Sequence, residues 1–147
     1  MKLKDLLKKK DGKYRMVITV GSDEAVSSAI LKLVEYDRGS MPVCDKKGQL
    51  VGIITERDIV RKCFISNNSG IEIKVQDVMS KQVVIGNPED DLDYAISAMK
   101  QERIRHLPIV DDHGVIGMIS MRDLLGIQLE ESNVTVRYLQ DYISGKY

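Results

Sequence analysis

Residues 41–58 read MPVCDKKGQLVGIITERD, and residues 107–123 read LPIVDDHGVIGMISMRD. The two prolines lie 66 positions apart and the two closing aspartates 65 positions apart, so the second copy is one residue shorter between them. The offset of 66 also holds upstream, where it pairs Val17 with Val83. A match of this length between two parts of one chain indicates an internal duplication. We therefore expect two similar structural halves.

Each copy predicts the same succession of elements: a strand, a helix, a hairpin of two strands and a second helix. In the first copy we expect these elements at residues 17–20, 26–34, 41–45, 50–55 and 57–64. In the second copy we expect a strand that begins at Val83, followed by elements at 92–99, 107–110, 115–120 and 122–128. Both hairpin turns contain a glycine, Gly48 or Gly114, at which a positive φ angle is expected.

Two apolar stripes predict which faces of the first helices are buried. They comprise Val26, Ala29, Ile30, Leu33 and Val34 in the first copy, and Leu92, Ala95, Ile96 and Met99 in the second. Their spacing of three and four residues is typical of an amphipathic helix. Ser22 is expected to be the N-cap of the first helix. Asn87, with Pro88 at the first helical position, is expected to be the N-cap of the second.

One copy alone offers a single sheet face to bury, so we expect the two copies to pack sheet to sheet in one α+β body. The first copy, with an N-terminal lead-in helix, is predicted to occupy residues 1–66, and the second copy residues 71–129. The polar stretch 67–70 is the junction, and the first copy has six extra residues before its strand. Residues 130–147 are expected to form a helical tail whose helix ends at Gly145.

Composition argues against several classes of function. The chain has 147 residues with 22 basic and 22 acidic side chains, which does not fit a dedicated nucleic-acid binder. It contains no apolar run of membrane-spanning length and no signal-peptide stretch, so a cytoplasmic location is expected. Cys44 and Cys63 have neither metal-ligand spacing nor a CxxC pattern, and we interpret them as buried, reduced thiols.

A motif of the form Gly-h-h-Ser/Thr-x-Arg-Asp, where h is apolar, occurs in each copy where a strand meets a helix. Thr55 with Asp58, and Ser120 with Asp123, fit a capping box, which explains each motif taken singly. The alternative is a binding site in which the hydroxyl, free helix amides and the carboxylate face one crevice. A carboxylate can accept bonds from both hydroxyls of a ribose, and helix amides attract phosphate. Repetition of the motif after similar proline-containing strands favours the second interpretation.

The ordered pair of motifs resembles the tandem CBS motifs of the module called a Bateman domain, over roughly residues 1–129. The resemblance implies a β-α-β-β-α fold for each motif, packing of the two sheets about a pseudo-twofold axis, and dimerisation into a flat disc. It also implies two clefts that bind adenosyl ligands such as AMP, ADP or ATP, or less often S-adenosylmethionine or NAD. Short stand-alone proteins of this kind are similar in the Arg-His-Leu-Pro segment, here residues 105–108, and in the C-terminal tail.

The resemblance implies, in addition, that each cleft is shared between the two copies. In the first cleft the residues carried over are Thr55, Asp58, Val83, Val84, Arg105, His106, Leu107 and the adjoining Pro108. In the second cleft they are Ser120, Asp123, Val17, Ile18, Gly39, Ser40, Met41 and the adjoining Pro42. Arg105 and His106 are expected to contact phosphate in the first cleft. The second cleft has Gly39 and Ser40 at these places, and Arg38 is the alternative cation there.

The two histidines have different expected roles. His113 lies in a hairpin turn and is interpreted as a solvated loop residue. His106 fits a partly buried side chain with a backbone partner as well as it fits a phosphate contact. A metal site formed by Asp111, Asp112 and His113 is a minor alternative, because three ligands in one turn are crowded.

The sequence therefore predicts a non-catalytic, cytoplasmic, dimeric sensor of adenine nucleotides that needs no cofactor besides its ligand. The ligand would tie the two copies together and alter the dimer or the surface of a regulated protein partner. The dimer is expected because Leu124, Leu125 and Ile127 lack an evident internal partner.

Two alternatives stay open: a structural dimerisation module with empty clefts, and a binder of S-adenosylmethionine or NAD(H). An enzyme is not supported, since neither motif places a nucleophile beside a base. The choice of nucleotide, the number of occupied clefts, the orientation of the dimer and the role of the tail are not fixed by the sequence.

Overall fold

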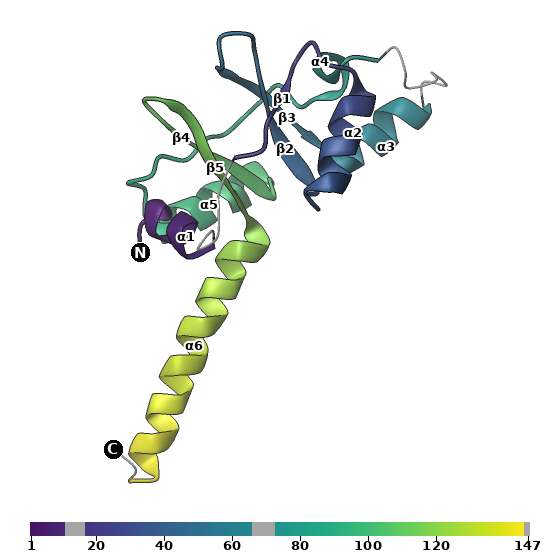
Figure 1. The fold of residues 1–147 in the computed structure, drawn as a ribbon. Coiled ribbons are helices and arrows are strands. Elements are labelled where there is room, and N and C mark those ends of the chain that lie inside the picture. Colours follow the sequence, from purple (N-terminus) through teal and green to yellow (C-terminus); the bar gives the residue numbers. More distant parts are fainter. Residues whose placement is uncertain (11–16, 66–72, 146–147) are drawn as a thin grey trace.

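The computed structural model describes residues 1–10, 17–65 and 73–145 (Figure 1). The expected junction at 67–70, and residues 11–16 of the longer first lead-in, lie outside the described residues. In chain order the elements are α1 (Leu3–Lys10), β1 (Val20–Gly21), α2 (Val26–Glu35), β2 (Ser40–Cys44), β3 (Leu50–Thr55), α3 (Glu56–Ile65), α4 (Val75–Val78), α5 (Leu92–Glu102), β4 (His106–Asp111), β5 (Gly114–Ser120) and α6 (Met121–Ile143).

The strands form two small sheets that meet through β2 and β5. One sheet has the order β1-β2-β3, with β1 parallel to β2 and β2 antiparallel to β3, and the other consists of the antiparallel pair β4-β5. In Figure 1, α2 and α3 flank the first sheet, and α1 and α5 lie by the second. The predicted α+β class with two related halves is confirmed.

The two hairpins repeat each other in detail. Ser40 pairs with Thr55 in the first hairpin, and His106 pairs with Ser120 in the second. The register shifts at the corresponding place in both, after Val43 and after Ile109, which are 66 positions apart. The turn glycines have the expected positive φ angles, +80° at Gly48 and +116° at Gly114, a conformation that glycine adopts without a steric penalty.

The first strand of each copy is shorter than predicted. Strand β1 contains only Val20 and Gly21, so it begins three residues later than the expected strand 17–20 and ends one residue beyond it. Val17 and Ile18 line a cleft instead of pairing with β2. In the second copy the corresponding segment is reduced to a single parallel bridge between Gly86 and Ile109.

The predicted N-caps of α2 and α5 are wrong. The caps are Ala25 and Asp91, and neither makes a side-chain cap hydrogen bond. A tight turn precedes each helix and uses the residues that the sequence suggested as caps. Asn87, for example, accepts the Glu89 amide on its side chain at 2.9 Å. This local Asx bond competes with capping, so the helix begins one turn later.

The apolar stripe of α5 is buried as predicted, with Leu92, Ala95, Ile96 and Met99 in the core. The stripe of α2 is only partly buried. Its residues Val26, Ala29 and Leu33 are in the core, whereas Ile30 and Val34 are 41% and 74% exposed. The helical spacing was therefore correct, but the stripe of α2 is wider than the surface that covers it.

Each half completes its core with the lead-in segment of the other half. Leu3, Leu6 and Leu7 of α1 belong to the same buried cluster as Leu107 and Ile119 of the second hairpin. The equivalent segment of the second half crosses in the opposite direction. Its residues Val75, Val78 and Met79 lie in the buried cluster of the first half. Packing therefore crosses the predicted boundary between residues 1–66 and 71–129.

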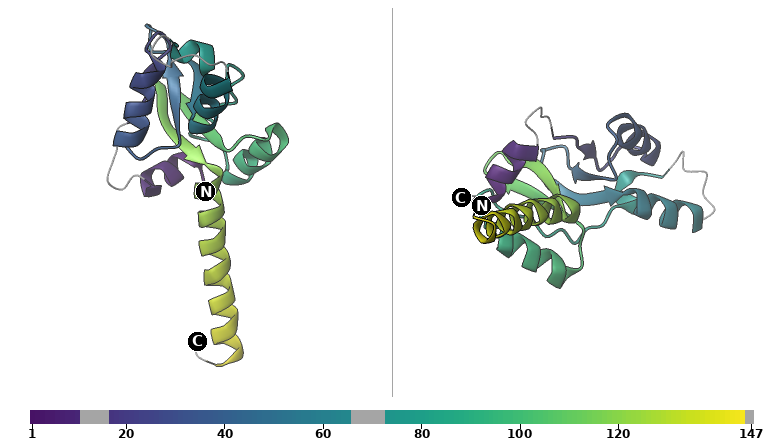
Figure 2. Two further views of the ribbon diagram at one scale, coloured as in Figure 1. Left: turned by 90° about the vertical axis from the view of Figure 1, so that its right-hand side faces the viewer. Right: turned by 90° about the horizontal axis from the view of Figure 1, so that it is seen from below.

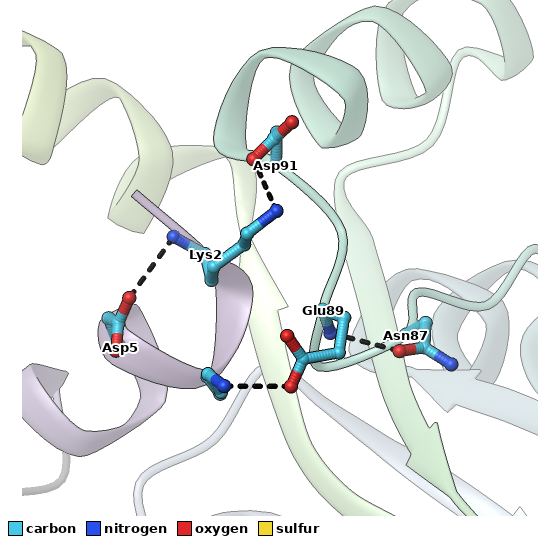
Figure 3. A network of polar contacts seen from close by, with 6 residues as sticks. Lys2, Asp5, Asn87, Glu89 and Asp91 are labelled. Atoms are coloured by element: carbon cyan, nitrogen blue, oxygen red, sulfur yellow. Dashed lines mark hydrogen bonds and ion pairs between the residues drawn. The ribbon is translucent and has the colours of Figure 1, made fainter.

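Backbone bridges anchor both crossings at equivalent positions. Lys2 bridges to Asp91 and Lys74 bridges to Ala25, and Ala25 and Asp91 are 66 positions apart. Figure 3 shows the first crossing, where Lys2 Nζ is 3.0 Å from an Asp91 carboxylate oxygen and Lys4 Nζ is 2.7 Å from Glu89 Oε1. These ion pairs are largely exposed, so they contribute little beside the buried leucines.

The repeated glycine of each motif lies where a crossing segment passes over the sheet. A Cβ atom on Gly117 would lie 2.5 Å from Leu7 Cδ2. A Cβ atom on Gly52 would lie 2.6 Å from Met79 Sδ and 2.8 Å from the Ser80 carbonyl oxygen. The Ile53 amide donates to that same carbonyl at 3.0 Å, and the Ser80 amide donates back to the Ile53 carbonyl at 2.8 Å. Only glycine leaves room for this backbone pairing.

Helix α6 is longer than expected. We predicted a helix that ends near Gln128 and a separate tail, but one continuous helix of 23 residues runs to Ile143. Leu124 and Ile127 are buried in the core of the second half, so they are not the unpartnered residues on which the dimer expectation rested. Leu125 is exposed as expected. Beyond the body the helix projects alone, as Figures 1 and 2 show.

Gly145, where the helix was expected to end, follows α6 with a positive φ angle of +70°. None of the helices in the described part of the chain, α6 included, combines the length and apolar composition that crossing a membrane requires.

Replacing Gly52 with Ala should lower the free energy of unfolding by about 1–3 kcal/mol, because the methyl group displaces Met79 and the Ser80 carbonyl. Gly126→Ala in α6 is the matched control, since, apart from its chain neighbours and the nearby backbone of its own helix, no atom lies within 4 Å of its Cβ position. It should stabilise the protein by up to about 1 kcal/mol through helix propensity. Urea unfolding of the two variants tests this. Equal midpoints would show that the crossing tolerates a side chain at residue 52.

Candidate functional site

The hydroxyls of both motifs cap the helices that follow them. Thr55 Oγ1 accepts the Asp58 amide at 3.0 Å, and Ser120 Oγ accepts the Asp123 amide at 3.1 Å. In the second motif the bond is reciprocal, because Asp123 Oδ2 accepts the Ser120 amide at 2.9 Å. The capping interpretation is therefore confirmed, and Ser120 with Asp123 forms a complete capping box.

The helix amides are less available than the binding interpretation assumed. The first amide of α3, from Glu56, donates to the Gly39 carbonyl at 3.0 Å. The first amide of α6, from Met121, donates to the Arg105 carbonyl at 2.8 Å. In each helix the third amide is used by the cap, so the expectation of several free amides is wrong. An anion at this place would have to be held mainly by side chains.

A cleft of about 350 Å³ lies where the two hairpins meet, and we call it the second cleft. Its lining comes from both halves and consists of Val17, Ile18, Asp37, Arg38, Gly39, Ser40, Pro42, His106, Gly117, Met118, Ser120 and Arg122. The volume falls in the range of pockets that hold small molecules.

Most residues predicted for the second cleft are brought together there. Val17, Ile18, Gly39, Ser40, Pro42 and Ser120 line it. Met41 does not, because its side chain is fully buried in the core of the first half. Asp123 lies beside the cleft, and its carboxylate completes the capping box with Ser120.

Residues predicted for the first cleft are more dispersed. His106 lines the second cleft instead, because the hairpin register places it directly across from Ser120. Leu107 is buried in the core of the second half, and Val84 packs against that core. Val83 lines a separate groove between the two hairpin turns. The structure therefore shows His106 at the second cleft and the Leu107 side chain in the core, and the expected ligand contacts of these residues and Val83 beside Thr55 stay a prediction.

The remaining first-cleft residues keep an untested role. Thr55 and Asp58 are half-buried at the start of α3, Arg105 is exposed, and Pro108 is buried in β4. Their expected contacts with a ligand stay a prediction.

The second cleft has a mixed electrostatic character. Arg38, the alternative cation of the sequence analysis, lines it together with Arg122 and His106, and Asp37 supplies one carboxylate. Arg122 was overlooked, although it belongs to the Arg-Asp pair that both motifs share. That repetition was the signal that could have identified it. Val17, Ile18 and Met118 add an apolar surface to the same cleft.

The cysteines take no part in this cleft. Neither takes part in a disulfide bond, and Cys63 is buried whereas Cys44 is partly buried. Burial raises the pKa of the Cys63 thiol. Burial also raises the pKa of Cys44, and the neighbouring Asp45 carboxylate adds to the effect. A raised pKa keeps a thiol protonated at neutral pH and therefore unreactive.

No set of three or more His, Cys, Asp or Glu side chains in the described ranges could hold a metal ion. His113 is exposed in its turn, as expected, and its amide donates to Asp111 Oδ1 at 2.8 Å. That carboxylate therefore stabilises the turn, and the metal alternative for Asp111, Asp112 and His113 has no support.

Two segments of the chain, residues 14–64 and residues 75–130, each match the family model of the CBS domain. The chain belongs to the CBS-domain family. The two matched segments cover the two copies of the repeat, so this is a CBS pair. CBS pairs are in general regulatory ligand-binding modules, and stand-alone CBS proteins are in general not enzymes.

Among similar proteins, the mitochondrial CBS domain-containing protein CBSX3 of Arabidopsis thaliana is 32% identical over 153 aligned positions, which cover 99% of this chain and 73% of that protein. A solved protein with CBS domains from Burkholderia ambifaria MC40-6 is 31% identical with a TM-score of 0.77, covering 85% of this chain and 91% of that one.

The CBS pair of protein MJ0100, solved in complex with 5′-methylthioadenosine and S-adenosylmethionine, has a TM-score of 0.76 at 23% identity. The match covers 89% of this chain and 98% of that one. This third comparison shows that the fold is the same.

Replacing Ser120 with Ala should remove the cap of α6 and cost about 1 kcal/mol of folding stability. Ser97→Ala is the control, because Ser97 is exposed in the middle of α5, where alanine is the better helix former. Thermal melting without ligand measures both variants. A Ser120→Ala variant as stable as the wild type would mean that the capping box contributes nothing to the fold.

Proposed function

We propose that this CBS pair is a regulatory module that binds an adenine nucleotide in the second cleft. The supporting observation is the combination of side chains there: an apolar surface, a motif hydroxyl and two arginines within one cavity of about 350 Å³. A nucleotide offers the matching groups, namely a flat base, ribose hydroxyls and an anionic phosphate.

The cleft suggests an orientation for such a ligand. The base would pack against Val17 and Ile18, which lack strand partners of their own in this segment. The ribose would lie near Ser120 and Asp123, whose oxygens have lone pairs beyond those that the cap uses. The phosphates would face Arg38 and Arg122, because an arginine can donate two bonds at once to an anion.

Regulation would follow from the position of the cleft between the halves. Val17, Ile18 and Arg38 come from the first half, whereas His106, Ser120 and Arg122 come from the second. A ligand that contacts both halves favours the arrangement that it fits best, and it shifts the population by its differential affinity. When this arrangement of the halves changes, the surface that they present to a second copy or to a regulated protein would change as well.

A homodimer is part of this proposal, but its surface differs from the one expected from the sequence. Ile30, Leu31 and Val34 of α2 are 41%, 69% and 74% exposed, and Val60 of α3 is 57% exposed. Together they form an apolar face on two adjacent helices of the first half, which fits burial against another copy.

Thermal melting with AMP, ADP and ATP tests the proposed binding. A nucleotide at about 100 times its dissociation constant should stabilise the fold by about 2.7 kcal/mol. S-Adenosylmethionine, 5′-methylthioadenosine and NAD form the comparison set, and a larger shift with one of them would change the ligand class. If none of these compounds shifts the melting temperature, the module is a structural dimeriser with empty clefts.

Arg122→Ala should weaken ATP binding more than adenosine binding, because only ATP presents phosphate to the guanidinium. The loss for ATP should shrink as salt is raised, since salt screens charge interactions near the surface. Arg137→Ala is the control, because Arg137 is exposed on α6 outside the cleft. Calorimetry that finds equal losses for ATP and adenosine in Arg122→Ala would remove the phosphate role from this residue.

A further inference from the structure

In the part of the chain that the structure describes, the outer part of α6 is exposed to solvent. Leu124 and Ile127 are the last residues of this helix that reach the core. From Gln128 to Gln140 every residue is exposed. The left view of Figure 2, turned by 90° from Figure 1, also shows the helix projecting clear of the body. A helical segment of this length is only marginally stable in water unless tertiary packing supports it.

The exposed residues of α6 contain a regular seam. Its members alternate at spacings of four and three residues: Leu125, Leu129, Ser132, Val136, Leu139 and Ile143. This is the spacing of the two core positions of a heptad repeat. The five apolar members are all exposed, from 51% for Val136 and Leu139 to 84% for Ile143. The seam is therefore unburied along its whole length.

The residues beside the seam are suited to pairing with an identical helix. The flanking heptad positions hold Gly126, Gln128, Asn133, Thr135, Gln140 and Tyr142, and none of them carries a charge. The charged side chains Glu130, Glu131, Arg137 and Asp141 occupy the outer positions. Two copies can therefore approach along the seam without placing like charges next to each other, which would oppose pairing.

The seam also has the residue types of a two-stranded assembly. Leu129, Val136 and Ile143 share one core position, and two of these three are β-branched, whereas Leu125 and Leu139 occupy the other. β-Branched residues at the first of these positions with leucine at the second favour two strands. Ser132 interrupts the seam near its middle. Ser132 shares the core position of Leu125 and Leu139, and a polar residue at a core position lowers the stability of the pairing.

We propose that the seam of α6 packs against the seam of α6 in a second copy of this chain, so that the two helices form a short coiled coil. The proposed occupant is a second copy because the seam is self-complementary: it is apolar at its core and uncharged at its flanks. This contact is separate from the apolar face of α2 and α3, and it does not depend on nucleotide binding.

Val136→Asp and Val134→Asp make a matched pair that tests the contact. Both variants place the same charge in the same exposed helix, but Val136 lies in the seam and Val134 lies on the opposite side of the helix. Analytical ultracentrifugation without nucleotide, over a range of micromolar concentrations, measures the association constant. Val136→Asp should lower it by about tenfold or more, whereas Val134→Asp should leave it within about twofold of the wild type.

Circular dichroism supplies a second measurement that does not assume how the bodies associate. The outer helix should lose helicity on dilution of the wild-type protein and in Val136→Asp, because an unpaired segment of this length frays. Leu129→Asp is a second seam variant, and retention of the wild-type melting transition of the body shows that either variant is folded. Association and helicity that are the same in the wild type, Val136→Asp and Val134→Asp would overturn the proposal, as would a wild type that stays monomeric at every concentration.

Discussion

The exchange of lead-in segments between the two halves is the constraint on which the rest of the structure depends. Leu7 passes over Gly117, and the Met79–Ser80 segment passes over Gly52, so each motif glycine receives a segment of the opposite half. Each buried cluster therefore contains residues from both ends of the duplication. The hairpins are held against each other by these crossings, and the second cleft lies between them. Residues of both halves line this cleft because the exchanged segments hold the two hairpins together.

Capping and binding are compatible roles for the repeated motif. The Ser120 hydroxyl accepts one amide, and the Asp123 carboxylate accepts another. A hydroxyl oxygen has two lone pairs and can also donate its hydrogen, and a carboxylate has about four acceptor sites. A ligand hydroxyl could therefore join the same network without displacing the cap. Because the cap fixes the side chains in place before any ligand arrives, the entropy cost of ordering them on binding would be small.

Local sequence patterns correctly predicted the features that depend on residues close together in the chain. They failed for the features that depend on contacts between distant segments. The hairpins, their turn glycines and the buried stripe of α5 follow from periodicity and turn chemistry, so they were predicted well. An offset of 66 identifies equivalent residues but does not say which half faces which, so it did not show that His106 lines the second cleft. For the same reason the crossing of α1 to the second half could not be predicted. The exposure of Ile30 and Val34 depends on how much surface covers α2, which no local pattern contains.

The exchange also affects the order in which the protein can fold during synthesis. Leu3, Leu6 and Leu7 are synthesised before both hairpins, yet they pack with Ile119 and Leu124, which are made more than a hundred residues later. Until then the N-terminal helix has no core to join. The first half likewise lacks Val75, Val78 and Met79 while only residues 1–66 exist. A nascent chain thus carries unfinished apolar surfaces until the second hairpin and the start of α6 have been made, and the two halves can reach their final packing only together.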